Sequence, residues 1–173
     1  MLSRRKFGLL LTTAIIMTGA SRLTLFDRQA QAADEKHFEI TRSDEEWRRL
    51  LTPDQYEILR GHGTERAGSS PLDDEKRAGT FACAGCDLPL FSSKTKYDSR
   101  TGWPSFWAPL DDAIGTSVDN SFFMTRIEVH CRRCGGHLGH VFEDGPPPTG
   151  LRYCMNGIAM TFVPDEAQTS GNT

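Results

Sequence analysis

The sequence of 173 residues lacks several features that would point to particular classes of protein. It has no internal repeats and no low-complexity tracts, so its length corresponds to one domain with a short additional segment. No apolar run reaches the about 20 residues that a membrane-spanning helix needs. With 38% hydrophobic and 25% charged residues, the composition is that of a globular protein that can bury a core.

The first 32 residues are expected to be a cleaved export signal rather than part of the domain. Three basic residues at positions 4–6 precede a short apolar stretch at 7–20, and "AQA" at 30–32 is a cleavage signature. The arginine pair in "SRRKFGLL" favours the twin-arginine route over the general secretory route. We therefore expect residues 33–173, with a core at about 41–164, to act in the periplasm with no stable membrane insertion after cleavage.

The remaining chain lacks a basic excess. Residues 1–32 contain five of the 20 Lys and Arg residues and one of the 23 acidic residues, so residues 33–173 have 15 basic and 22 acidic side chains, a net charge of −7. Binding to nucleic acid phosphates requires a basic surface. The charge therefore argues against a nucleic acid partner.

The residue pattern predicts a mainly β domain with two short helices at its N-terminal end. Ser43 and Thr52 are each followed three residues later by Glu or Gln, which is the capping-box signature of a helix start. The polar stretch 62–79 is expected to be an extended arm over the surface. Short apolar runs separated by Gly, Pro and Asp follow it, which is typical of antiparallel strands.

The final run, "LRYCMNGIAMTFVP" at 151–164, is expected to be one strand. Its even-numbered positions then share a face, and three of those five positions are apolar. That face should point inward, which would put Cys154 at the edge of the core.

Four of the five cysteines form a C-x2-C…C-x2-C pattern that predicts a closed structural metal site, with Cys83, Cys86, Cys131 and Cys134 as ligands. Gly135 would provide the permissive backbone of the second turn. Four sulfur ligands suit zinc or iron, and zinc is preferred here. Two disulfides are the alternative in an exported protein. Transport of a folded twin-arginine substrate favours metal, because the metal can be loaded in the cytoplasm.

The fifth cysteine, Cys154, has no CxxC partner and is the candidate nucleophile. Taken alone it could be a small buried side chain. Its neighbours favour chemistry, because Arg152 brings a positive charge that can stabilise a thiolate and Asn156 brings amide donors. The nearby "CGGHLGHVFEDG" contains His137 and His140 together with Asp144. A thiol beside imidazoles is a general arrangement for covalent catalysis, although these side chains could instead bind metal or form a structural network.

An aromatic loop, "TGWPSFW" at 101–107, also bears on the site. Phe106 is expected to be a core residue. Trp103, in a Gly-Trp-Pro turn, is expected to be partly exposed and to form a flat apolar wall that could hold a small apolar group such as a methyl.

Several segments together resemble the B class of methionine sulfoxide reductases, which are specific for the R epimer. They are "CAGCDLPLF" at 83–91, "GWPSF" at 102–106 and "CRRCGGHLGHVFEDGPPPTGLRYCMNG" at 131–157. The similarity begins near "LTPDQYEILRGHGTER" at 51–66 and extends to Phe162. The resemblance implies a β-tent of two antiparallel sheets and one structural zinc ion on the two CxxC pairs.

The resemblance also implies roles for the site residues. The thiolate of Cys154 would attack the sulfoxide sulfur and become a sulfenic acid. The sulfoxide oxygen would be bound and protonated by His137, His140 and Asn156. The substrate-binding residues would be Trp103, Phe142, Arg152 and Asp144. Oxidised proteins or peptides would be the substrates, and a thioredoxin-like thiol protein would be the reductant.

The sequence departs from the family pattern at the position before "GWPSF". Many members have a resolving cysteine there, whereas this chain has Thr101. Since the metal would occupy the other four thiols, an external thiol is expected to reduce the sulfenic acid directly. Arg100 and Gly157 also differ from the residues usual in the family.

Two other functions remain open from the sequence. One is a zinc-clipped β-sheet that binds a partner without catalysis, and the other is a rubredoxin-like electron carrier with iron on four sulfurs. The joint presence of Cys154 and Trp103 favours the enzyme over the binding module, and the colour of an iron centre would distinguish the electron carrier from a zinc protein.

Overall fold

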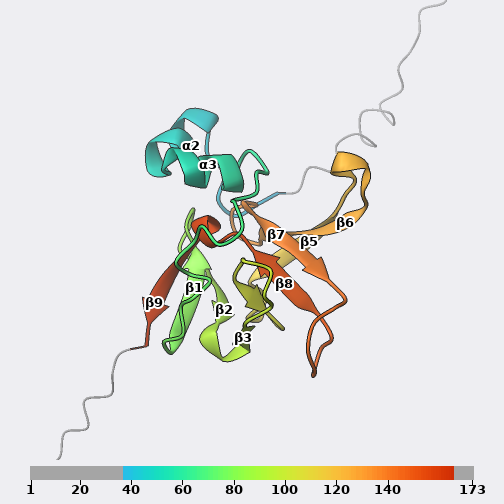
Figure 1. The fold of residues 1–173 in the computed structure, drawn as a ribbon. Helices are drawn as coiled ribbons and strands as arrows, with labels where there is room; N and C mark the ends of the chain where they lie inside the picture. Colours follow the sequence, from blue (N-terminus) through green and yellow to red (C-terminus); the bar gives the residue numbers. More distant parts are fainter. Residues whose placement is uncertain (1–36, 166–173) are drawn as a thin grey trace, which may run out of the picture. The chain divides into compact units, whose positions relative to one another are not determined.

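A computed structural model describes residues 37–165, which contain the helices α2 and α3 and the strands β1 to β9 (Figure 1). The predicted signal at 1–32 lies outside this range. The mainly β fold class, with two antiparallel sheets and two N-terminal helices, is confirmed. Within the described range, no helix is long and apolar enough to cross a membrane.

Both predicted helix starts are confirmed. Helix α2 spans Asp44–Leu50 and helix α3 spans Pro53–Leu59. In each, the side chain of the N-cap residue accepts a hydrogen bond from the third residue of the helix, and the side chain of that third residue bonds back to the N-cap backbone. This reciprocal bonding satisfies N–H groups that a helix start otherwise leaves unpaired.

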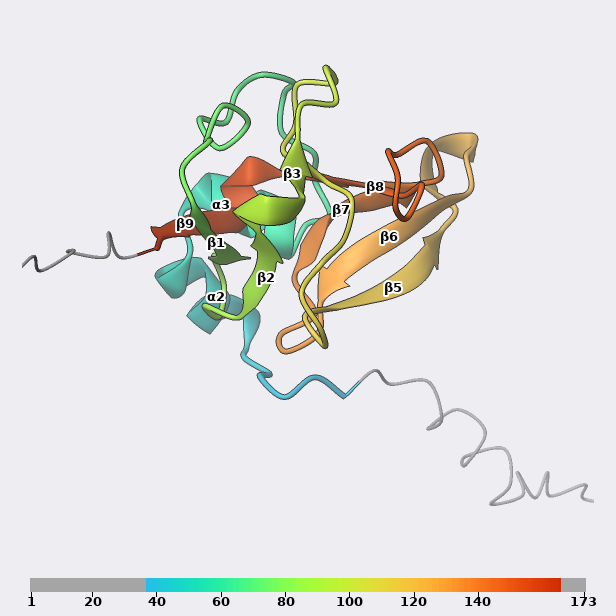
Figure 2. The same ribbon diagram turned by 90° about the horizontal axis from the view of Figure 1, so that it is seen from below.

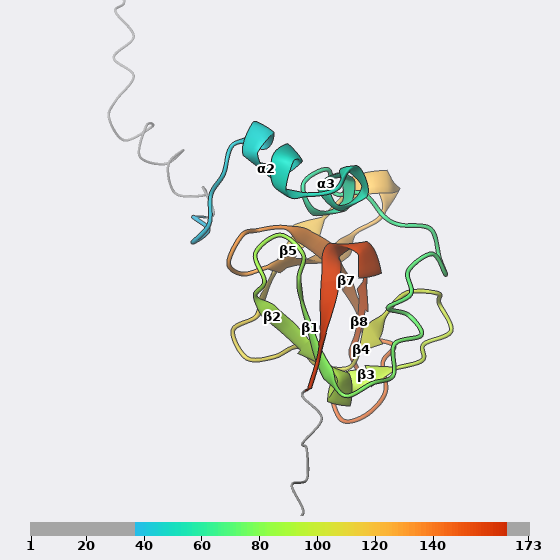
Figure 3. The same cartoon turned by 90° about the vertical axis from the view of Figure 1, so that its left-hand side faces the viewer.

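The helices lie together at one end of both sheets (Figures 1 and 3). They attach through a few apolar side chains, and Trp47, Ile58 and Leu59 are each at least 96% buried. Burial of a large apolar side chain contributes about 1.5–3 kcal/mol. Helices of only two turns are marginal in water, so this packing rather than helix propensity holds them in place.

The smaller sheet has three strands in the order β2-β1-β9, which are Pro89–Ser92, Gly79–Cys83 and Met160–Pro164. The larger sheet has six strands in the order β3-β4-β8-β7-β6-β5. Its strands, in that order, are Lys96–Tyr97, Ser105–Phe106, Arg152–Met155, His137–Phe142, Arg126–Cys131 and Ile114–Asp119. All neighbouring strands are antiparallel.

Three phenylalanines fill the space between the two sheets. Phe81 and Phe91 come from the smaller sheet and Phe106 comes from the larger one, and all three are fully buried. Phe106 stacks on Phe91 with ring centroids 4.4 Å apart and meets Phe81 edge-on at 5.0 Å. The prediction that Phe106 is a core residue is therefore confirmed.

The expectation of a single strand across residues 151–164 is wrong. Strand β8 ends at Met155, a 3-10 turn η4 covers Gly157–Ala159, and β9 begins at Met160 in the other sheet (Figure 2). The run therefore links the two sheets, and its even-numbered residues do not share one face. The turn forms because the backbone N–H groups of Gly157 and Ile158 bind the side chain of Glu65, a distant residue.

The expectation of a surface arm at 62–79 is also wrong in part. Glu65 is 6% exposed and Ser70 is 7% exposed, so the segment dips into the molecule at these two points. A polar sequence predicted exposure, but each side chain has a hydrogen-bond partner that allows burial.

Candidate functional site

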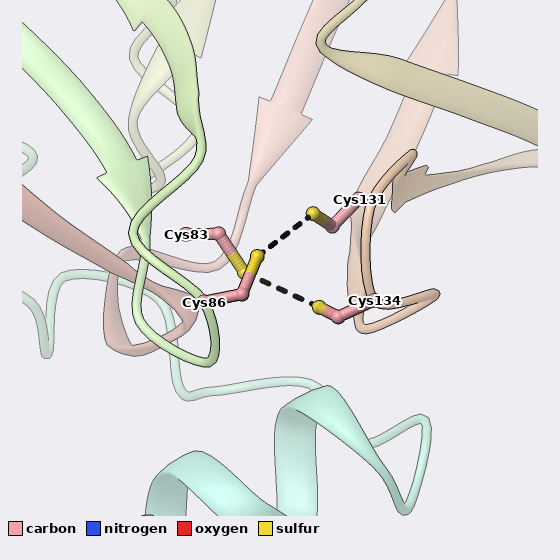
Figure 4. Close-up of side chains that lie close together, drawn as sticks. All are labelled: Cys83, Cys86, Cys131 and Cys134. Atoms are coloured by element: carbon pink, nitrogen blue, oxygen red, sulfur yellow. Dashed lines mark hydrogen bonds between the residues drawn. The ribbon is translucent and has the colours of Figure 1, made fainter. Parts of the chain in front are cut away.

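The two CxxC segments form similar turns that face each other (Figure 4). In each, the residue after the second cysteine donates its N–H to the carbonyl of the first, at 2.8 Å for Asp87 and 2.9 Å for Gly135. Both residues have left-handed backbones, with φ of 57° and 69°. The permissive role predicted for Gly135 is confirmed, and a side chain there would collide with the ring of Phe38.

The four sulfurs converge with the spacing of a metal site. Each is within 4.8 Å of the others, with Sγ to Sγ distances of 3.7 Å for Cys83 and Cys134 and 3.5 Å for Cys86 and Cys131. Tetrahedral zinc with bonds of about 2.3 Å places its sulfurs about 3.8 Å apart. All five cysteines are free rather than paired in disulfides. The four cysteines thus form a structural metal site that fits zinc, and they leave no ligand position open.

Cys154 lies in the larger sheet between β4 and β7, with Ser105 and His140 as its cross-strand neighbours. It borders a cavity of about 140 Å³. Gly139 also borders the cavity, and a Cβ there would lie 2.2 Å from the carbonyl oxygen of Cys154. A glycine is needed at that position for the two strands to approach. The lining residues are Thr64, Trp103, Arg126, Gly139, His140, Phe142, Cys154 and Asn156.

The cavity therefore brings together five of the predicted site residues. Trp103, partly buried, supplies an indole wall, as expected from its turn. Its Nε1 donates to the carbonyl oxygen of Glu65 at 3.1 Å, which fixes the orientation of the ring. An apolar wall and a thiol in one small cavity suit a substrate with a small apolar group next to the atom under attack.

His140 is held against the cavity by an acidic residue of the neighbouring hairpin. Its Nε2 lies 2.8 Å from Oδ2 of Asp119, which also pairs with Arg126 at 2.7 Å. Hydrogen bonds from Ser121 and from His140 keep the pKa of Asp119 well below its usual value. Burial lowers the pKa of His140, so this imidazole is neutral at pH 7 in the resting protein. Its Nε2 then carries the proton that Asp119 accepts.

His137 does not line the cavity at Cys154. It lies in an adjoining cavity, with its ring centroid 5.3 Å from that of His140. Its Nδ1 is 2.9 Å from Oε1 of Glu128, and its Nε2 is buried without a hydrogen-bond partner. Hydrogen bonds from His137 and His62 hold the pKa of Glu128 far below its usual value. Glu128 is therefore an ionised acceptor, and Nδ1 of His137 is the donor of this hydrogen bond.

Arg152 and Asp144 lie outside the cavity. The guanidinium of Arg152 makes two 2.8 Å bonds to the carboxylate of Asp144 and lies over the ring of Phe142, 4.4 Å from its centroid. Phe142 borders the cavity. Arg152 and Asp144 thus position an aromatic wall and do not line the cavity themselves.

The thiol of Cys154 is not activated in the resting protein. Burial raises its pKa, and the hydroxyl of Thr101 and the charge of Arg152 offset that effect only in part. Thr101 Oγ1 is 3.9 Å from the sulfur. Ser99 bridges Thr101 at 2.8 Å and Ser105 at 2.7 Å, which forms a chain of hydroxyls beside the thiol.

Asn156 is 3% exposed and its amide is already engaged. Its Oδ1 accepts from the backbone N–H of Glu65 at 2.9 Å, and its Nδ2 donates to the carbonyl of Leu138 at 3.1 Å. These bonds tie the end of β8 to the 64–65 segment. In this geometry the amide supports the cavity wall.

The sequence model of the SelR domain family matches residues 51–164 of this chain. These residues include both CxxC turns and the whole cavity at Cys154. The chain belongs to the SelR domain family.

Several relatives match most of the chain. "Peptide methionine sulfoxide reductase MsrB" of Pseudomonas putida (strain W619) is 55% identical over 126 residues, which cover 72% of this chain and 95% of that protein. The protein of the same name from Methanosarcina barkeri is 51% identical over 133 residues, covering 76% and 94%. The one from Agrobacterium fabrum is 52% identical over 126 residues, covering 72% and 93%.

Sequence reasoning missed three acidic residues of this SelR domain. Asp119 and Glu128 hold the two histidines, and Glu65 ties Trp103, Asn156 and the turn after β8 together. Asp119 and Glu128 lie on the β5–β6 hairpin, outside the segments that carry the resemblance to the family. The only sequence signal for Glu65 was a charged residue within the segment that resembles the family.

Proposed function

We propose that this SelR domain is a peptide-methionine (R)-S-oxide reductase that repairs oxidised proteins, with Cys154 as its nucleophile. The observation that carries the proposal is that the one cysteine outside the metal cluster shares a cavity with Trp103 and His140. The names of the relatives agree with it. A binding module without catalysis would need neither the thiol nor the aromatic wall in this arrangement.

The reaction follows from the chemistry of the cavity. The sulfur of Cys154 attacks the sulfoxide sulfur while the oxygen receives a proton, since it cannot leave as a bare dianion. The S–O bond of the substrate breaks, oxygen passes to Cys154, and the products are methionine and a sulfenic acid. The thiol is oxidised by two electrons and the sulfoxide is reduced by two.

The two histidines are the proton source in this scheme. His140 borders the cavity, and His137 stands behind it with Nδ1 bound to Glu128. Because the N–H of resting His140 is bound to Asp119, this ring must gain a proton before it can donate one to the sulfoxide oxygen. Trp103 and Phe142 would hold the substrate methyl, and Asn156, Arg152 and Asp144 would position these groups. The R preference would then come from which side of the sulfur faces the imidazole and which faces the indole.

The sulfenic acid would be reduced by an external thiol. Thr101 stands where a resolving cysteine would be needed, and the other four sulfurs fit the metal site. A first thiol displaces water to give a mixed disulfide with Cys154, and a second thiol releases the reduced enzyme. A thioredoxin-like protein with two cysteines supplies both. If residues 1–32 are a twin-arginine signal, domain 33–173 acts in the periplasm, with a reductant on that side.

The decisive experiment uses separated R and S epimers of methionine sulfoxide with a dithiol reductant. We expect turnover of the R epimer only, and loss of turnover in Cys154→Ser. Zinc content and thermal unfolding of the variant should match those of the wild type. The lost turnover would then be due to the missing thiol and not to misfolding. Turnover of the S epimer alone, or full activity of Cys154→Ser, would refute the assignment.

A further inference from the structure

A second cavity, of about 440 Å³, adjoins the cavity at Cys154. The two cavities share Thr64, Arg126 and His140 in their walls. The second cavity also contains His62, Glu128 and His137, of which only His137 was expected to act in the site. His62, Glu128 and His137 together form a set of possible metal ligands, and the proposed reaction gives no role to His62.

The donor atoms of these three residues converge. Nδ1 of His62 is 3.1 Å from Oε1 of Glu128, and Nδ1 of His137 is 2.9 Å from the same oxygen. One donor atom from each residue lies within 4.8 Å of the others. The two imidazole rings are adjacent, with centroids 5.2 Å apart.

We propose that His62, Glu128 and His137 form a second, exchangeable site for a divalent transition metal such as Zn²⁺. Imidazole nitrogens suit zinc, copper and nickel, and two histidines with one carboxylate are a known zinc ligand set that leaves a position for water. Bonds of about 2.0–2.1 Å in a tetrahedron place ligand atoms about 3.3 Å apart. The observed spacings of 2.9 and 3.1 Å are close to that value.

The three ligands differ in burial in a way that suits an exchangeable ion. His137 is 2% exposed on β7, and Glu128 on β6 is fixed by a hydrogen bond from Ser117. His62 is exposed and follows α3 with a left-handed φ of 54°, which is uncommon for a residue with a side chain. From that backbone the exposed ring reaches Glu128, so His62 is the ligand through which an ion could enter from solvent.

The surroundings of His137 are compatible with metal binding. Its Nδ1 lies against Glu128, and its Nε2 is buried without a partner. An imidazole that binds an ion through Nδ1 carries its N–H at Nε2, and no hydrogen bond of the described residues is lost at that nitrogen. The positive charge of Arg126 in the same cavity is paired with Asp119.

Occupancy of this site has a consequence for the reaction, and this part rests on the proposed function. An ion bound to His137 occupies an imidazole that the proposed reaction uses, 5.3 Å from that of His140 between ring centroids. The ion would therefore inhibit the enzyme reversibly, without contact with Cys154.

The binding test uses the full chain with the four-cysteine site already filled with zinc. The Cys154→Ser background removes the reactive thiol as a competing ligand. Titration calorimetry with Zn²⁺ should detect one further ion per chain. Adding His62→Gln should weaken that binding at least about 10-fold, since even the outer partners of a metal contribute that much. Glu128→Gln should weaken it as well, whereas His37→Gln, at an exposed histidine outside the cluster, should not.

The activity test measures a single turnover of pre-reduced enzyme that retains Cys154, because no added thiol is then present to chelate the metal. Added Zn²⁺ should slow methionine formation in the chain with His37→Gln and not in the chain with His62→Gln, each relative to its own rate without metal. If calorimetry detects no second ion, or if His62→Gln binds it as tightly as the chain with His62, the proposed site is wrong whatever the activity test shows. If the ion binds at the site but Zn²⁺ still slows methionine formation in the chain with His62→Gln, the site is not the cause of the inhibition.

Discussion

At the scale of single residues, the environment of Cys154 has opposing effects on the pKa of its thiol. Burial makes the thiol hard to ionise, whereas neighbouring groups favour the thiolate. Burial raises its pKa, while Thr101 and Arg152 oppose the increase. The resting sulfur is therefore mostly protonated at pH 7, which protects it from unwanted oxidation. The substrate must complete the activation.

This balance predicts the pH dependence of alkylation at Cys154. A raised pKa means less thiolate at neutral pH, so the rate with iodoacetamide should rise through a midpoint above that of a free cysteine. In Thr101→Val the hydroxyl is lost, and the midpoint should move to still higher pH. The matched control is Thr116→Val, at an exposed threonine of β5. A midpoint that is unchanged in Thr101→Val would show that the 3.9 Å contact has no influence on the thiol.

Glu65 is the second residue whose role belongs to this scale. Its carboxylate accepts from Gly157 and Ile158 at 2.6 and 2.9 Å, its N–H binds Asn156, and its carbonyl binds Trp103. One buried residue thus fixes the indole wall, the amide and the turn that follows the nucleophile strand. It also explains how a carboxylate can be 6% exposed.

Glu65→Gln should lower both stability and activity. The two backbone N–H groups bind different oxygens of the carboxylate, and glutamine replaces one of these oxygens by an NH2 group, so one donor is left unpaired at a cost on the order of 1–3 kcal/mol. Denaturant unfolding should show that loss, and the R epimer should be reduced more slowly. Glu57→Gln, at an exposed position of α3, is the control. Unchanged stability in Glu65→Gln would mean that water replaces the lost bonds.

At the scale of elements, some parts were predictable because their causes are local. Helices α2 and α3 start where Ser43 and Thr52 cap them, and each cap acts within three residues. The two CxxC turns likewise follow from short spacings. These features need no knowledge of the rest of the chain.

Other elements depend on contacts between distant residues, and there the sequence misled. The break between β8 and β9 is set by Glu65, which is 92 residues before Gly157. The two-residue periodicity of the sequence continues across the break, so this pattern alone predicts one strand. Asp119 and Glu128 reach the histidines only through the register of β5, β6 and β7. Such a register cannot be derived from either strand by itself.

The turn η4 gives a test of one of these distant contacts. A Cβ at Gly157 would lie 2.0 Å from Oγ and 2.5 Å from Cβ of Ser70, so this serine fills the space that a side chain at 157 would need. Gly157→Ala should therefore cost about 1–3 kcal/mol through overpacking. Ser70→Gly in the same chain should recover most of that loss. Urea unfolding of the four chains in a double-mutant cycle measures the coupling, and simple additivity would contradict the contact.

At the scale of the whole described domain, the metal cluster links its two sheets. Cys83 ends β1 and Cys86 precedes β2 in the smaller sheet, while Cys131 ends β6 and Cys134 precedes β7 in the larger one. The phenylalanine core lies between the same sheets. The strand that holds the nucleophile is part of the larger sheet, and its continuation β9 is part of the smaller one. Movement between the sheets would therefore disturb the cavity.

Removal of one metal ligand should consequently destabilise the domain as a whole. In Cys86→Ser the site loses a thiolate on a half-exposed turn, so little core packing changes. Zinc content should fall below one ion per chain. Since metal affinity contributes directly to folding, stability should fall by at least about 3 kcal/mol, which lowers Tm by about 10 °C or more.

Cys154→Ser is the matched control for this experiment, because it removes the same kind of side chain outside the cluster. It should keep its zinc and its Tm while losing sulfoxide reduction. Cys86→Ser should instead lose zinc and have a lower Tm. It should still reduce the sulfoxide while it is folded, and this activity should decline as the protein unfolds on warming. If Cys86→Ser retained both its zinc and its Tm, the four sulfurs would not be the device that holds the sheets together, and the phenylalanine core alone would have to position the nucleophile strand.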